Sequence, residues 1–169
     1  MILKEKGLNF KVNFSIIPLY FGKRAKVYTI QFQANELNAY EQFVLDNMLV
    51  VPDAVRTLDK QLRQISTKYG IIDDQFKRES PQSHQVYRIE DTEDWLRIFC
   101  IKYSRVAIVL GGGGLKDELK VKLDENPELL KVRDILMQIE DQIHEKVISK
   151  EIKITDNGFE GDLVFKSED

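Results

Sequence analysis

The alternation of apolar and polar residues predicts two strands near the start of the chain. Apolar side chains occupy every second position between residues 8 and 17, and again between residues 26 and 33. This period of two is typical of half-buried strands. Pro18 and Gly22 are expected to end the first strand and to form the turn before the second.

Two amphipathic helices are predicted to follow. The first begins near Asn35, a residue type that favours the N-cap position, and ends before Pro52. The second runs from about Asp53 to Tyr69, and Gly70 lies where a helix C-terminal cap is expected. So short a link between the two predicts an antiparallel helical hairpin.

A third helix has the clearest signals. Asn126 is a good N-cap, Pro127 suits the first helical position, and apolar residues continue at helical spacing to about Ser149. Beyond it, the turn residues Asp156 to Gly158 predict a pair of short strands.

Residues 95–116, WLRIFCIKYSRVAIVLGGGGLK, carry the strongest strand signal. Their nearly continuous apolar runs predict two central strands covered on both faces, joined by a turn at Lys102 to Ser104. Residues 86–90 predict a further strand, linked to this pair by a turn at residues 91–94. Gly111 to Gly114 lack the register of a phosphate-binding loop. They are interpreted as a flexible bend out of the sheet, with an anion-binding nest of glycine amides as the alternative.

The order of these elements predicts one α+β domain of two layers. An antiparallel or mixed central sheet is expected beside the N-terminal helical hairpin and the C-terminal helix. Residues 1–25 form an extension, residues 26–149 the core, and residues 150–169 the short final strands and a tail.

Composition and charge narrow the functional classes. The hydrophobic fraction of 43% and the charged fraction of 31% are those of an ordinary globular protein. No apolar run is long enough to span a bilayer and the N-terminus lacks a signal-peptide pattern, so we expect a cytoplasmic protein without a membrane partner. Cys100, the one cysteine, lies inside an apolar strand and is interpreted as a core residue.

The net charge of −3 is unevenly distributed. Residues 1–55, 56–122 and 123–169 carry net charges of +1, +3 and −7. The acidic last third argues against an indiscriminate nucleic-acid binder, which would have a broad basic face. A local basic patch on the central strands remains compatible with this pattern, as does the simpler interpretation of ordinary solvated charges.

Four cations fall among the apolar residues of the central strands: Arg97, Lys102, Arg105 and Lys116. Arg88 on the preceding strand is expected to lie beside Arg97, and two neighbouring arginines repel each other unless an acid or anion lies between them. Lys60 and Arg63 are on the polar face of the second helix. The two histidines, His84 and His144, are far apart in the sequence and there is no cysteine cluster, so neither a metal site nor a cofactor is predicted.

These segments resemble the RelE/HigB branch of bacterial type II toxins. The likeness rests on the helical hairpin ending in KYG, on LRIFCI, on RVAIVLGGGGLK and on the NPELL helix, and covers about residues 26–149. It implies a RelE-like fold and metal-independent mRNA cleavage through the ribose 2′-hydroxyl. It also implies an inhibitory helix-turn-helix antitoxin encoded nearby, and mRNA as substrate with or without the ribosome.

The resemblance also suggests roles for individual residues. Arg97 matches the arginine of the family's Leu-Arg strand and would hold the phosphate, while Lys116 matches the basic residue after the turn. A cation would offset charge on the phosphorane, and a second group would move protons. Arg88 is a further catalytic candidate, with Tyr103 or His84 as the proton carrier. The candidates for RNA binding are Lys102, Arg105, Lys60 and Arg63.

Two other functions stay open. The pI near 5.5 is low for a protein that grips RNA, and the C-terminal strands lack the Tyr or His often found there in the family. A toxin-like protein without nuclease activity, acting by binding other molecules, is therefore one alternative. An accessory protein of a phage or mobile element is the other.

Overall fold

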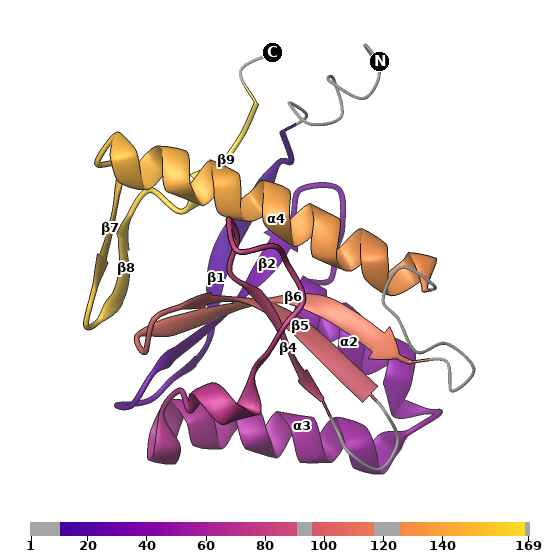
Figure 1. Ribbon diagram of the computed structural model, residues 1–169. Helices are drawn as coiled ribbons and strands as arrows, with labels where there is room; N and C mark the ends of the chain where they lie inside the picture. The colour runs from indigo at the N-terminus through magenta and orange to yellow at the C-terminus, as the bar shows by residue number, and fades with distance from the viewer. Residues whose placement is uncertain (1–10, 91–95, 117–125, 168–169) are drawn as a thin grey trace.

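The computed structural model describes residues 11–90, 96–116 and 126–167. Its main feature is a seven-stranded sheet in the order β3-β4-β5-β6-β2-β1-β9 (Figure 1). Neighbouring strands are antiparallel except β2 and β6, which are parallel. The strands of this sheet are β1 (Phe14–Phe21), β2 (Lys26–Phe32), β3 (Lys77–Arg78), β4 (Val86–Glu90), β5 (Leu96–Tyr103), β6 (Ala107–Leu115) and β9 (Val164–Phe165).

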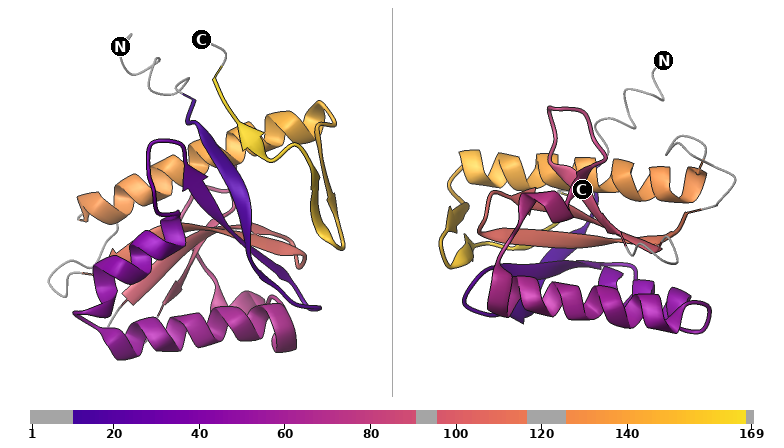
Figure 2. Two further views of the ribbon diagram at one scale, coloured as in Figure 1. Left: turned by 180° about the vertical axis from the view of Figure 1, so that it is seen from behind. Right: turned by 60° about the horizontal axis from the view of Figure 1, so that its bottom comes forward.

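Helices cover both faces of this sheet. One face packs against α2 (Ala39–Met48), α3 (Pro52–Gln64) and the π-helix η1 (Ile65–Tyr69), and the other against α4 (Pro127–Ile148), as the right-hand view of Figure 2 shows. We call these the α2/α3 face and the α4 face. The fold is thus mixed α+β, as predicted, but the expected two layers are wrong. The physical reason lies in β5 and β6, which are apolar on both faces and need a cover on each.

The helix boundaries follow from local capping. The side chain of Asn38, not Asn35, caps α2, and Glu41 completes a capping box with it. Pro52 begins α3, because a missing amide costs nothing in the first turn. The predicted cap at Gly70 is confirmed: this glycine ends η1 with a φ of 75°. The limits predicted for α4, Asn126 as N-cap and an end near Ser149, are also confirmed.

The prediction that Pro18 ends the first strand is wrong: β1 continues through Pro18 to Phe21. The amide of Ile16 points away from β2 and donates to the carbonyl of Leu163 at 3.0 Å. Strand alternation places position 18 on the same outer edge, where a proline removes no bond to β2. Pro18 therefore limits pairing along this edge while β1 and β2 stay joined.

The glycine run is part of β6 and not a bend out of the sheet. Gly112, Gly113 and Gly114 pair in register with Phe99, Ile98 and Arg97 of β5. A Cβ at Gly111 would meet the side chain of Leu136 on α4 at 2.5 Å. The glycines thus allow α4 to lie close against the sheet, and both the bend and the anion nest are wrong.

The last described residues return to the first strand. The predicted hairpin is formed by β7 (Ile152–Thr155) and β8 (Gly158–Gly161), and β9 then pairs with the start of β1. The ammonium of Lys146 on α4 donates to the Asp162 carboxylate at 3.0 Å and to the carbonyl of Val164, and lies 4.2 Å from the ring centroid of Phe165. This lysine fastens the C-terminal segment to α4.

Parts of two predictions lie outside the described residues: positions 8–10 of the first strand, and the turn at 91–94 with Trp95. Within the described ranges, no helix has both the length and the apolar character needed to cross a membrane.

Substitution of Gly113 by alanine is expected to destabilise the protein by about 1–3 kcal/mol, the usual cost of overpacking. A Cβ there would overlap the carbonyl oxygen of Arg97, a backbone atom that cannot rotate away. At Gly114 the nearest atom is a methyl of Leu129 at 3.8 Å, so Gly114→Ala is the matched control. Urea denaturation measures both, and equal losses would show that the space at Gly113 is not the constraint.

Candidate functional site

The two arginines expected to lie side by side do so, and two glutamates lie between them. Glu90 on β4 is the register partner of Arg97 on β5, and Arg88 lies two residues earlier on the same face. Glu79 directly follows β3, where its amide bonds to the carbonyl of Val86. We call Glu79, Arg88, Glu90 and Arg97 the Arg/Glu quartet.

Each arginine of the quartet has a close carboxylate partner and a more distant one. Arg88 Nη1 donates to Glu79 Oε1, and Arg97 Nε donates to Glu90 Oε2. The second contacts are longer: Arg97 Nη1 to Glu79 Oε1 at 3.9 Å, and Arg88 Nε to Glu90 Oε2 at 3.8 Å. The condition derived from the sequence, an acid between the arginines, is therefore met by the chain itself.

The quartet is neutral as a whole and largely buried. The exposed fractions of its side chains are 6% for Arg97, 7% for Glu79, 17% for Arg88 and 18% for Glu90. A phosphate would have to displace a carboxylate from a site with little contact with water, where separating an ion pair is costly. This geometry opposes the phosphate-binding role predicted for Arg97 and the catalytic role predicted for Arg88.

Lys116 lies at the same end of the sheet as Arg97. It follows β6, whose last residue Leu115 pairs with Leu96 at the start of β5. Arg97 and Lys116 therefore both lie near this end of the β5–β6 pair.

The two predicted proton carriers lie elsewhere. The hydroxyl of Tyr103, at the end of β5, is buried without a hydrogen-bond partner in the described residues. Burial, and then the charge of Glu140, raises its pKa well above the ordinary value. His84 lies in the loop before β4, where its Nε2 is 2.9 Å from Asp141 Oδ1 on α4. Neither side chain shares a hydrogen bond with the described atoms of the quartet, so the predicted catalytic set does not converge.

Lys102 and Arg105 meet at one aspartate that the sequence interpretation missed. Lys102 Nζ lies 2.9 Å from Asp73 Oδ1, and Arg105 Nη2 lies 3.2 Å from Asp73 Oδ2. The lysine also lies over the ring of Tyr87, 4.5 Å from its centroid. Lys102 is nearly buried, whereas Arg105 stays open to solvent.

Lys60 and Arg63 are exposed on α3, beside a second unpredicted cluster. Arg63 Nε donates to Asp59 Oδ2 at 2.8 Å, and its guanidinium lies 4.4 Å from the ring centroid of Tyr20. Both Tyr20 and Tyr40 donate their phenolic hydroxyls to Asp59 Oδ1. This cluster ties β1, α2 and α3 together; the i, i+4 spacing of Asp59 and Arg63 was its one readable signal.

The titration behaviour of this cluster follows from burial and hydrogen bonding. Burial and the bond to Asp59 raise the pKa of Tyr20 to about 12, and the pKa of Tyr40 rises further for the same reasons. Burial acts to raise the pKa of Asp59, but the bonds from Arg63 and the two tyrosines leave it below its ordinary value. The aspartate thus stays ionised and both phenols stay neutral near pH 7.

The described residues offer no other obvious chemistry of the predicted kinds. No group of three or more His, Cys, Asp or Glu side chains in them could hold a metal ion. Cys100 is buried, and burial raises the pKa of its thiol to about 12, so it is a core residue and not a nucleophile.

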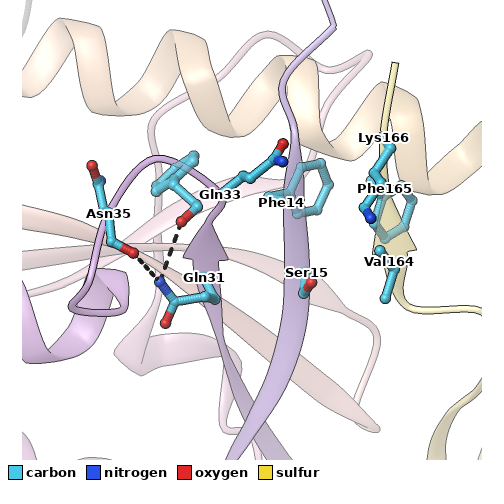
Figure 3. A pocket seen from close by; sticks show the side chains of 9 residues that line it. Phe14, Ser15, Gln31, Gln33, Asn35, Val164, Phe165 and Lys166 are labelled. Carbon is cyan, nitrogen blue, oxygen red and sulfur yellow. Dashed lines mark hydrogen bonds between the residues drawn. The ribbon is translucent and has the colours of Figure 1, made fainter. Parts of the chain in front are cut away.

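A pocket lies where β1 begins and β2 ends, on the side where β9 joins the sheet (Figure 3). Its volume is about 220 Å³, and its wall includes Phe14, Phe32 and Phe165 together with several amide side chains. The amide of Gln31 donates to the carbonyl oxygens of Phe32 at 3.2 Å and Asn35 at 2.7 Å. None of the predicted site residues lines this pocket.

A scan against protein-family models finds no match to this chain, and searches of curated proteins and of solved structures find none either.

Replacing Arg97 by methionine should lower the free energy of unfolding by about 3–5 kcal/mol, because a buried carboxylate loses its partner. The double variant Arg97→Met/Glu90→Met removes both charges of that pair and should recover most of the loss. Arg56→Ala, which breaks an exposed pair with Asp53, is the control and should cost about 0–1 kcal/mol. Chemical denaturation measures the free energy of unfolding of each variant. If the double variant is as unstable as Arg97→Met, the loss does not come from an unpaired Glu90 carboxylate.

Asp59→Asn should cost about 1–3 kcal/mol near pH 7, because two phenols and a guanidinium lose a charged acceptor. Since the folded pKa of Asp59 is lowered, its contribution is complete above the ordinary carboxyl pKa of about 4 and disappears as the pH falls below it. The difference between wild type and variant should therefore shrink in acid. Thermal unfolding across this pH range tests this, with the exposed Asp46→Asn as control; a pH-independent difference would contradict it.

Proposed function

We propose that this chain is a RelE/HigB-like protein that works by binding a protein partner and does not cleave RNA with its predicted residues. The observation that carries the proposal is the buried, neutral Arg/Glu quartet. Arg97, the arginine expected to hold a phosphate, is paired with Glu90, and Arg88, a further catalytic candidate, is paired with Glu79.

The order of elements supports the family part of the proposal. The family pattern has a helix pair, a strand with Leu-Arg, a hydrophobic strand, basic residues at a turn and a proline-led helix. In this chain α2 and α3 precede β5 with its Leu96-Arg97, β6 follows, Lys116 comes next, and Pro127 begins α4. Fold-level likeness supports kinship but does not carry an activity with it.

The chemistry of cleavage explains why binding is favoured. Metal-independent attack by a ribose 2′-hydroxyl needs a cation at the phosphorane and a proton carrier within hydrogen-bond reach. The Tyr103 hydroxyl is buried and His84 is bound to Asp141, away from the quartet. A binding protein needs neither arrangement, and its partner would be the antitoxin-like helix-turn-helix protein that the resemblance implies.

Cleavage of mRNA is the second candidate, and one observation favours it. Lys116 follows the strand that pairs with the start of β5, so the two residues that match the family's basic positions lie at one end of the sheet. The exposed Lys60, Arg63 and Arg105 would then contact RNA.

Induction of the wild-type chain in a bacterial culture should leave cellular transcripts intact. The same result is expected for the Arg97→Ala/Lys116→Ala variant, because the proposed role does not use these cations for chemistry. Growth curves and transcript 5′-end mapping provide the measurement, with the purified chain on a defined mRNA, with and without ribosomes, as a second arm.

Because Arg97 is buried, its substitution can unfold the protein, so a second variant is needed to separate loss of folding from loss of RNA cleavage. Lys60→Ala/Arg105→Ala changes exposed cations and leaves the quartet unchanged, so it should fold as the wild type does. Cuts at defined sites by the wild type that weaken in this well-folded variant would overturn the binding proposal and establish the nuclease.

A further inference from the structure

Three large aliphatic side chains protrude where α2 ends and the chain turns into α3. Their exposed fractions are 61% for Leu45, 95% for Leu49 and 67% for Val50. Single exposed leucines are common on protein surfaces, but three large aliphatic residues within six positions form a patch of the kind that marks interaction sites.

The patch is not explained by the packing of α2. This helix buries Ala39, Tyr40 and Phe43 against the rest of the fold. Leu45 and Leu49 are four residues apart, so they are neighbours on another side of the helix, and Val50 adjoins them. In the described residues nothing covers them.

The turn between α2 and α3, which carries these side chains, is also ordered by hydrogen bonds. The carbonyl oxygen of Asn47 accepts the amides of Leu49, of Val50 at 3.2 Å and of Val51 at 2.9 Å. The Asn47 side chain is itself bonded to the carbonyl of Phe43 at 2.8 Å. An ordered apolar ridge loses little conformational freedom when a partner binds.

The charged residues nearest to this patch along the chain are acidic. Residues 27–55 contain no lysine or arginine, but they contain four acidic residues. Asp46 lies between Leu45 and Leu49, and Asp53 begins the exposed side of α3. The nearest cation along the chain, Arg56, is already paired with Asp53 at 3.2 Å.

We propose that Leu45, Leu49 and Val50 form a docking ridge for a protein partner whose apolar side chains are flanked by lysine and arginine. Carboxylates beside the ridge repel nucleic acid and anionic lipid. A second copy placed symmetrically would bring the same carboxylates face to face. This inference rests on the proposed function, of which it names the contact surface.

The probe is a synthetic amphipathic helix with a leucine face flanked by lysines, carrying a fluorescent label. Titration of the full chain, followed by anisotropy, should show binding that weakens at least about tenfold in Leu49→Ser/Val50→Ser. Asp46→Lys/Asp53→Lys should weaken it severalfold, and an analogue with glutamate in place of lysine should not bind. The control is Ile148→Ser, which changes an isoleucine of 67% exposure at the end of α4.

Several outcomes of these measurements would overturn the docking-ridge proposal. The proposal is overturned by a lysine peptide that does not bind, or that binds the serine variant equally. It is also overturned by equal binding of the glutamate peptide, by capture on phosphatidylglycerol vesicles, or by a dimer in sedimentation that the serine variant abolishes. RNA cleavage with selective peptide binding would overturn the proposed function alone, whereas intact RNA without peptide selectivity would overturn the ridge alone.

Discussion

The parallel pairing of β2 with β6 is the constraint on which the rest of this fold depends. Four register pairs, from Lys26 with Ala107 to Thr29 with Leu110, join segments about eighty positions apart. In the sheet, β5, β4 and β3 lie beyond β6, and β1 and β9 lie beyond β2. Since β5, β6 and β2 are buried on both faces, the chain needs a helical cover on each.

Polar side chains inside this framework serve mainly to join its parts. The Arg/Glu quartet links the edge of the sheet to β5, and Asp59 with its two tyrosines links β1 to α2 and α3. Ion pairs with so little solvent contact add modestly to stability, but they strongly penalise any arrangement that separates them. A basic residue in the middle of a sheet can thus be a structural element with no charge left for a ligand.

Local signals in the sequence were sufficient where a few neighbouring residues decide the structure. The caps at Asn126 and Gly70 and the turn at Gly158 are of this kind. The glycine strand was not predictable, because its reasons are tertiary: Gly111 faces Leu136 of α4, and Gly113 faces the carbonyl oxygen of Arg97. The cations of the candidate site were identified, but their partners Glu79 and Asp73 come from the segment between η1 and β4, whose path depends on tertiary contacts.

The pairing of β9 with β1 has a consequence for synthesis on the ribosome. β1 and β2 are made first and can form a hairpin early, yet β2 gains its second neighbour only after residue 110 has left the exit tunnel, and β1 gains its neighbour only after residue 165. Until residue 110 emerges the nascent hairpin has two unpaired edges, and the edge of β1 stays unpaired until residue 165 emerges; unpaired edges are prone to aggregation. Pro18 protects one of them from the start, so the proline serves the growing chain as well as the finished sheet.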